Sequence, residues 1–274
     1  MRTTVAGGRG IGHRAGSEKS LSSANVFASL ARVKILVVTN LYPPLDNRAN
    51  TLHNRPKPIM QLTKNTLLLI FAALTTAIAR DANKANETLL RATSPFEDMV
   101  EFALARNDPG ITKALAMADS HAAAVRDALP AGASGQFNTL LQAIHKAATA
   151  KEHHALATSA VEVFRLLIDN LEAGSLKVPK EVSLLDYAGF KLHVLAAASQ
   201  PDWTAMRQTV DEAAKWWAAT KPKVSDKKLA DAFSSTVRGL QQAGKIEHLP
   251  MLNFAAQIDL DLVDLLEGYF ERKK

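Results

Sequence analysis

Apolar residues recur at helical spacing over most of the chain after residue 80. Ala and Leu dominate this part, runs of β-branched residues are rare, and proline and glycine separate the periodic segments. This pattern predicts helices throughout. The first is expected near 95–107 and the second ends near 128; the others span about 136–148, 151–173, 180–198, 202–220, 226–243 and 249–272.

The eight predicted helices group into four pairs, each with an aromatic residue in its first helix. These residues are Phe96, Phe137, Tyr187 and Phe233, which lie 41, 50 and 46 positions apart. The sequence therefore predicts an all-α fold of four antiparallel helical hairpins, as a helical bundle or a short solenoid. The spacing also fits an internal duplication with halves 94–174 and 180–274. Unrelated hairpins give similar spacings, so both interpretations stay open.

The apolar positions predict which helix faces are buried. The segment 180–198 is apolar nearly all round, which predicts a central helix. The second helix has one apolar stripe, made of Ile111, Leu115, Ala118, Ala122, Val125 and Leu129. For the last helix the predicted buried stripe is Met251, Ile258, Leu262, Leu265 and Tyr269.

The segment 60–79 has the three-part layout of a secretory signal peptide. A short polar, positive stretch after Met60 precedes an uncharged, mostly apolar run over 66–79, which ends in a small-x-small pattern before Arg80. As a helix this run is about 21 Å long, short of the ~30 Å hydrocarbon core, so no stable membrane span is expected after cleavage. The prediction is a periplasmic or secreted protein with a mature domain over 80–274.

The segment 1–59 is rich in glycine, serine and arginine and has no sustained period, which predicts disorder. Because a signal peptide should be N-terminal, we also expect that translation begins at Met60 and that 1–59 is a mis-assigned upstream extension. N-terminal sequencing of the native protein tests both expectations, since a mature terminus well before Arg80 would contradict them.

Charge and cysteine content exclude several kinds of function. Residues 1–79 hold ten Lys/Arg and two Asp/Glu, whereas 80–274 hold 23 and 25, so the basic excess lies entirely in the front segment. The mature domain lacks the positive field that attracts a phosphate backbone, and no nucleic-acid partner is expected. The chain has no cysteine, which excludes disulfides, thiolate catalysis and cysteine metal sites.

Asp186 and His193 are the best candidates for a ligand-binding pair. They lie seven residues apart on the predicted central helix, hence on nearly the same side and about 10.5 Å apart along its axis. Gly189 lies between them and is expected to leave a hollow. Partly buried polar groups need partners, so a polar pocket for a small ligand or metal is one interpretation. A structural hydrogen-bonded pair is the other.

A metal or haem site is the second candidate. His121 and His193 are its possible metal ligands, although no His-Glu-x-x-His or Glu-x-x-His motif occurs. The Phe96-Glu97-Asp98-Met99 opening and the hairpin around Pro201 resemble cytochrome b562-type bundles. That resemblance implies haem held by a methionine of the first helix, which Met99 matches, and a histidine of the fourth. The corresponding stretch 163–171 and the last helix after His248 contain no histidine.

No catalytic template fits the chain. Its serines lie in polar turns or at helix starts without a nucleophile elbow, and its acidic residues are scattered as on solvated helix faces. We therefore expect an exported, non-catalytic helical protein that binds a protein partner or a small ligand and needs no cofactor. The alternative is a periplasmic metal or haem carrier.

Overall fold

The computed structural model describes residues 82–272, where every regular element is helical. After a helical stretch over 82–91, eight helices follow: α3 (Ser94–Leu104), α4 (Asp108–Ala128), α5 (Ala131–Ala150), α6 (His153–Asp169), α7 (Lys180–Ala196), α8 (Trp203–Thr220), α9 (Lys227–Lys245) and α10 (Leu249–Arg272). The all-helical prediction is confirmed. The predicted disordered segment 1–59 and signal peptide 60–79 lie outside the described residues.

Side-chain caps account for several of the helix starts. Asn107 accepts a hydrogen bond from the Gly110 amide at 3.1 Å before α4, and Asp202 accepts from the first-turn amides of α8 at 3.0 Å. Asp226 does the same before α9. Each cap satisfies amides that have no partner within the helix, which fixes where the helix begins. These local signals explain why the predicted and observed boundaries agree within a few residues.

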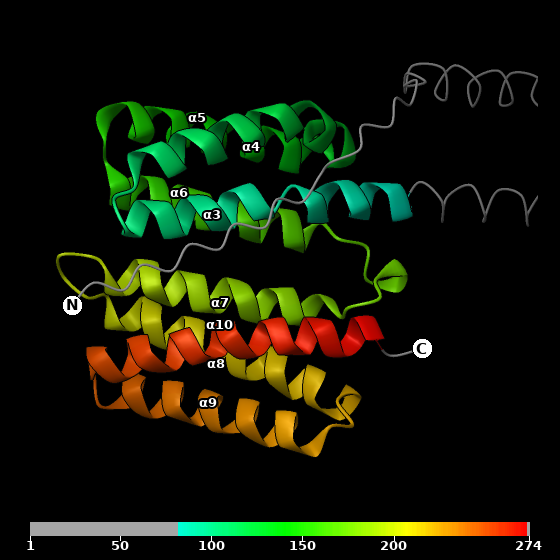
Figure 1. Cartoon of the computed structure of the whole chain (residues 1–274), viewed down its shortest axis with the longest axis vertical. Coiled ribbons are helices and arrows are strands. Elements are labelled where there is room, and N and C mark those ends of the chain that lie inside the picture. The colour runs from blue at the N-terminus through cyan, green and yellow to red at the C-terminus, as the bar shows by residue number, and fades with distance from the viewer. Residues whose placement is uncertain (1–81, 273–274) are drawn as a thin grey trace, which may run out of the picture. The chain divides into compact units, whose positions relative to one another are not determined.

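The helices form two four-helix groups (Figure 1). Each helix from α3 to α10 contacts the next along the chain; in addition α3 contacts α6, and α7 contacts α10. The first group is therefore α3–α6 and the second is α7–α10. They meet through α7, which contacts both α6 and α3, so the predicted central position of this segment is confirmed. Whether the two groups arose by duplication stays a prediction.

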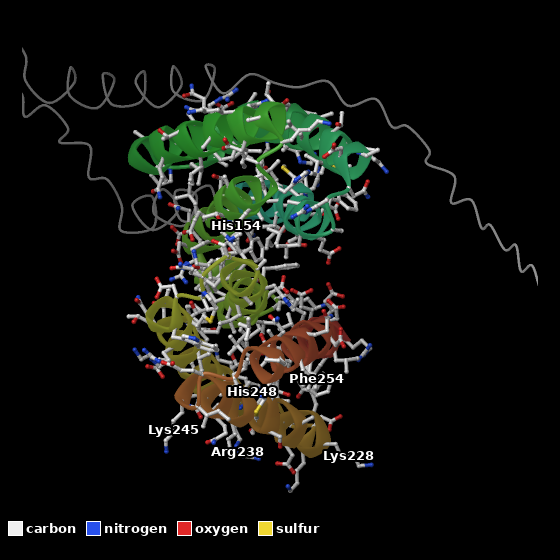
Figure 2. All side chains as sticks on the ribbon, turned by 90° about the vertical axis from the view of Figure 1, so that its left-hand side faces the viewer. His154, Lys228, Arg238, Lys245, His248 and Phe254 are labelled. Carbon is white, nitrogen blue, oxygen red and sulfur yellow. The ribbon has the colours of Figure 1, made fainter. Side chains whose placement is uncertain are left out.

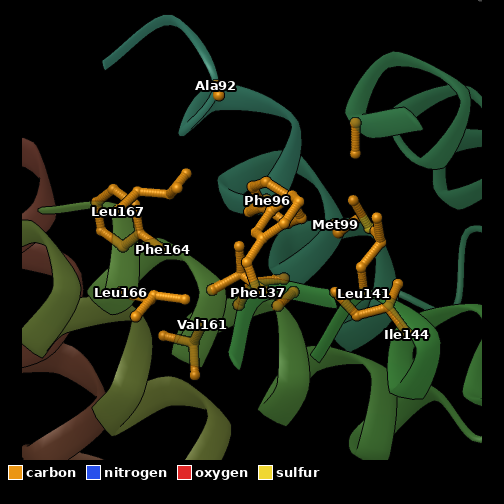
Figure 3. Close-up of a cluster of buried hydrophobic side chains, with 14 of the residues drawn as sticks. Ala92, Phe96, Met99, Phe137, Leu141, Ile144, Val161, Phe164, Leu166 and Leu167 are labelled. Atoms are coloured by element: carbon orange, nitrogen blue, oxygen red, sulfur yellow. The ribbon is translucent and has the colours of Figure 1, made fainter. Parts of the chain in front are cut away.

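Aromatic side chains fill the core of each group. In the first, the Phe96 and Phe137 rings meet edge to face at 6.3 Å, surrounded by aliphatic side chains of α3, α5 and α6 (Figure 3). In the second, Trp217 stacks on Phe233 at 4.5 Å. All four aromatic residues that mark the predicted pairs, including Tyr187, are buried. They serve as core residues, which is the ordinary role of a periodic aromatic position.

The predicted buried stripe of α10 is wrong by one position. Leu265, which belongs to that stripe, is 56% exposed, and the nearby Phe254 is 69% exposed and projects from the helix in Figure 2. The residues of α10 that are buried are Leu252, Ala255, Ala256, Asp259, Val263, Leu266 and Phe270. Asp259 occupies a core position of this true stripe. An acidic residue there interrupts the apolar periodicity of α10. The sequence pattern therefore predicts that the neighbouring face of the helix is buried.

The junction between the groups contains a stacked arginine. Arg165 of α6 lies 4.9 Å from the ring centroids of both Tyr187 of α7 and Trp216 of α8. Its guanidinium donates to Asp169 at 2.7 Å and lies 3.6 Å from Glu212. A cation held between two aromatic faces and two carboxylates links three helices across the junction.

Candidate functional site

Helices α3, α7 and α10 line two adjoining open cavities, and α6 with the segment after it lines one of them as well. Lobe 1 has a volume of about 410 Å³ and lobe 2 of about 490 Å³. Glu97, Asp186 and Asp264, one each from α3, α7 and α10, line both lobes, so these residues mark their junction. We call the two lobes together the acidic groove. Figure 1 shows the helices that form it, with α7 between α3 and α10.

Carboxyl groups dominate the lining of the acidic groove. Eight of them face it, against one lysine, Lys177, and one histidine, His193; the eight are Glu97, Asp98, Glu101, Asp186, Asp261, Asp264, Glu267 and Glu271. Within the part of the chain that the structure describes, no lysine or arginine forms an ion pair with any of the eight. Among the described residues, the lining of the groove therefore carries an excess of acidic over basic side chains.

Asp186 is the carboxyl group that α7 places at the junction of the two lobes. The residue is partly exposed, and no group of residues 82–272 donates a hydrogen bond to its carboxyl group. Burial raises its pKa well above the ordinary value, and the charges of Glu97, Glu267 and Asp259 raise it further. The cause is physical: an anion loses hydration there and meets only other anions.

Glu97 of α3, like Asp186 of α7, lines both lobes of the groove. Burial raises its pKa from 4.5 to about 7, the nearby Thr93 hydroxyl opposes the shift, and Glu267 adds to it. The pKa of Glu267 itself is raised, again chiefly by burial. Near neutral pH Glu97 is therefore partly protonated, and a cation that entered the groove would favour its charged form.

His193 contributes a second unpartnered group to the groove. It lines lobe 2, and its Nε2 atom is buried without a hydrogen-bond partner. Burial lowers the pKa of His193, which keeps the imidazole neutral and able to accept a hydrogen bond through an unprotonated ring nitrogen. The structure thus brings Asp186 and His193 to the same groove, as the sequence analysis expected for a polar pocket.

Gly189 has a different role from the expected one. The space beside it is not a hollow, because Leu260 of α10 fills it: a Cβ at Gly189 would lie 2.5 Å from Leu260 Cδ2 and 2.7 Å from Cγ. Gly189 lines neither lobe, whereas Leu260 lines lobe 2. The glycine therefore allows α7 and α10 to approach closely and sets the wall of the groove indirectly.

Replacing Gly189 by alanine is expected to destabilise the fold. The gain in helix propensity, about 1 kcal/mol, is smaller than the cost of displacing Leu260, so we expect a net loss of about 1–3 kcal/mol in unfolding free energy. Gly239→Ala in α9 is the matched control, since a Cβ there would lie 3.8 Å from Ala255 and the change should stabilise slightly. Denaturant unfolding of both variants measures the difference; equal stabilisation would contradict the close approach.

Asp259 lies behind the wall of the groove in the core of the second group. It is 0% exposed, and neither carboxyl oxygen has a hydrogen-bond partner. A Cβ placed on Gly189 of α7 would lie 3.4 Å from its Oδ2 atom. Gly189 itself is about one helical turn from Asp186. Burial raises the pKa of Asp259 well above its ordinary value, which favours the neutral acid. Leaving such a group unpaired costs free energy that apolar packing elsewhere must offset.

The candidate metal and haem residues are not brought together with one another. His121 is on α4, which packs on α3 and α5, whereas His193 is on α7. Met99 is fully buried in the first core, where its side chain lies near Leu141 and Ile144 (Figure 3). Over residues 82–272, no group of three or more histidine, aspartate or glutamate side chains is placed to hold a metal ion.

Glu97, Glu267 and Asp264 were not recognised as site residues from the sequence. Glu97 lies 89 residues before Asp186, whereas Asp264 and Glu267 lie 78 and 81 residues after it on α10. Each follows a solvated-face pattern within its own helix. Only the packing of α3 and α10 on α7 brings them together. Considered one helix at a time, the sequence contains no signal for this arrangement.

Two further observations concern the described helices and the similarity of this chain to known proteins. None of the helices within residues 82–272 has the length and apolarity needed to cross a membrane. Searches with family models, among curated proteins and among solved structures find no match to this chain. The function must therefore be argued from the geometry and chemistry of the acidic groove itself.

Proposed function

We propose that this protein is a non-catalytic binding protein whose ligand is a small organic cation held in the acidic groove. The observation that carries the proposal is the placement of Asp186, a partly exposed carboxyl group at the junction of both lobes without a hydrogen-bond donor among residues 82–272. A buried carboxylate without a partner is costly, and a bound cation supplies both charge and donors.

The lining of the groove favours binding over catalysis. Ser183 is a hydroxyl of lobe 1, whereas His193, the one histidine of the lining, belongs to lobe 2. Nucleophilic catalysis by a hydroxyl needs a base within hydrogen-bond reach, and these two residues lie ten positions apart on α7. What the groove does offer is an excess of acceptors on apolar walls, which suits recognition of an ammonium or guanidinium group.

An organic cation fits the groove better than a metal ion. Metal sites gather three or more ligand atoms at short range, and the carboxyl groups of the described helices have no such arrangement. Leu90, Phe164 and Leu176 in lobe 1 add apolar surface, which a hydrated metal ion cannot use. Aliphatic carbon on the ligand would bury that surface and contribute binding free energy.

Export of the protein remains part of the proposal on sequence grounds alone. The segment 60–79, whose layout is that of a signal peptide, lies outside the described residues. An exported protein of this kind would bind its cation outside the cytoplasm.

Isothermal titration calorimetry with butylammonium and 1,4-diaminobutane at pH 8 and low ionic strength tests the proposed function. Both are expected to bind, and Asp186→Asn is expected to weaken binding at least about tenfold, because an enclosed charged contact becomes a neutral one. Asp211→Asn is the matched control, since Asp211 is an exposed carboxylate of α8 outside the groove. Absence of binding by every amine, or equal effects of the two variants, would contradict the proposal.

A further inference from the structure

A fully buried acid interrupts the contact between α7 and α10. Asp259 of α10 is 0% exposed, and neither of its carboxyl oxygens has a hydrogen-bond partner among residues 82–272. The two helices lie side by side along this contact (Figure 1). Asp259 lines neither lobe of the acidic groove, so it is not part of the site described above. A buried polar group without a partner costs free energy, and it therefore does not serve packing.

Asp259 lies at the level where the apolar core of the second group divides. The buried apolar residues of α10 before it belong to one cluster and those after it to another; the first set is Leu252, Ala255 and Ala256, and the second is Val263, Leu266 and Phe270. Helix α7 divides at the same level, with Leu192 in the first cluster, Ala188 in the second and Gly189 between them. The contact between α7 and α10 thus consists of two apolar halves that meet at a carboxyl group and a glycine.

Leu260 closes this level on the side of the groove. A Cβ placed on Gly189 would lie 2.5 Å from Leu260 Cδ2 and 3.4 Å from Asp259 Oδ2, so both side chains of α10 meet the same position of α7. Leu260 also lines lobe 2, which is open to solvent. Movement of Leu260 away from Gly189 would therefore connect the Asp259 carboxyl group with the solvent of lobe 2.

The charged groups on the helices that pack against α10 do not compensate a charge on Asp259. On α7, Asp186 and His193 lie about one turn before and after Gly189; Asp186 is itself an acid, and burial keeps His193 neutral by lowering its pKa. The charged residues of α9 are all exposed, namely Lys227, Lys228, Asp231, Arg238 and Lys245. On α3, which lines the groove, the groups nearby are the acids Glu97, Asp98 and Glu101. A carboxylate at this position can be stabilised only by water.

The protonation of Asp259 and the opening of this level are therefore linked. Burial raises the pKa of Asp259 well above its ordinary value, so the closed arrangement holds the proton. An open, hydrated carboxyl group returns towards its ordinary pKa and releases the proton. Above that ordinary value, opening becomes more favourable as the pH rises, by up to about tenfold per pH unit for one proton.

We infer that Asp259 is a proton-dependent switch in the contact between α7 and α10. The protonated side chain keeps Leu260 closed on Gly189, and release of the proton separates the two helices at this level and admits solvent from lobe 2. This inference goes beyond the proposed function and requires no ligand. Because the level lies in the core of the second group, its opening is local and leaves the core of the first group closed.

Thiol labelling of single-cysteine variants tests this inference, since the chain has no cysteine of its own. Ala256→Cys places a thiol on α10 beside Asp259, at a residue that is 0% exposed. Ala160→Cys in α6, also 0% exposed, is the matched control in the core of the first group. Rates with a methanethiosulfonate reagent are divided by the rate of Ala218→Cys, an exposed position of α8, which corrects for the reactivity of the thiol at each pH.

At pH 8 the Ala256→Cys protein is expected to react at least about tenfold faster than the Ala160→Cys protein, because local opening needs less free energy than global unfolding. Its corrected rate should fall at least about tenfold from pH 8 to pH 6, and at least about tenfold at pH 8 when Asp259→Asn is added. Asp211→Asn, which removes an exposed carboxylate, should change the rate by less than about twofold.

Two results would overturn the switch. Equal rates for Ala256→Cys and Ala160→Cys at pH 8 would mean that this level opens only when the whole protein unfolds. A faster rate for Ala256→Cys that Asp259→Asn leaves unchanged would mean that the opening does not hydrate the carboxyl group. Ala188→Cys, at a fully buried position of α7 beside Gly189, should behave as Ala256→Cys does and replaces it if that variant fails to fold.

Discussion

The free energy of unfolding is expected to fall by at least about 2 kcal/mol between pH 5 and pH 8 at low ionic strength. The carboxyl groups of Glu97, Asp186, Glu267 and Asp259 all have raised pKa values in the folded protein, each chiefly because of burial. Above the ordinary carboxyl pKa the unfolded chain releases these protons while the folded protein retains them. Stability therefore decreases as the pH rises through this window.

The magnitude follows from the group with a stated shift. Glu97 moves from 4.5 to about 7, and one pKa unit corresponds to about 1.4 kcal/mol, so Glu97 contributes on the order of 2 kcal/mol after allowance for its partial exposure. The raised pKa values of Asp186 and Asp259 change stability in the same direction. His193 acts in the opposite sense, because its lowered pKa destabilises the folded protein below about pH 6.5.

Urea unfolding at pH 5, 6, 7 and 8 measures this dependence. Glu97→Gln should flatten the curve between pH 5 and 7, whereas Asp211→Asn, at an exposed site, should leave the slope unchanged. Stability that is constant or that rises from pH 5 to pH 8 in the wild-type protein would contradict the described burial of these carboxyl groups.

Replacing Asp259 by asparagine is expected to stabilise the protein at pH 8 by on the order of 2 kcal/mol. Asparagine has nearly the same shape but cannot ionise, so the variant avoids the cost of keeping a carboxyl group protonated, or charged, in the core. At pH 5 both the acid and the amide are neutral, and the two proteins should differ by less than about 1 kcal/mol. The gain should thus appear only as the pH rises.

Unfolding of Asp259→Asn and of wild type at both pH values tests this expectation. Asp211→Asn, which removes an exposed carboxylate, is again the control and should change stability little at either pH. Loss of stability in Asp259→Asn at pH 8 would mean that the carboxylate has a partner, and would contradict its isolation in the core.

The sequence was sufficient to predict the helices because their signals are local. Caps such as Asn107 and Asp202, prolines in first turns and the apolar period each act within a few residues. The buried face of α10 was not predictable in the same way. Asp259 occupies a core position there, and no rule based on apolar periodicity places an unpaired aspartate in a core.

The candidate site was predictable only in the part that lies on one helix. Asp186 and His193 share α7, so their spacing alone put them on one side. Glu97 and Glu267 join them through packing between helices distant in sequence, which single-helix patterns do not encode. The hollow predicted at Gly189 is wrong, because Leu260 of α10 fills the space beside the glycine.

A titration of the Glu97 carboxyl carbon by NMR, with and without 1,4-diaminobutane, tests the central claim most directly. The Glu97→Gln variant assigns the resonance. We predict a midpoint near pH 7 in the free protein, from the value of about 7 given by its burial, and a lower midpoint when the diamine is bound. A midpoint near 4.5 that the diamine leaves unchanged would contradict both the enclosed acidic groove and the binding of a cation within it.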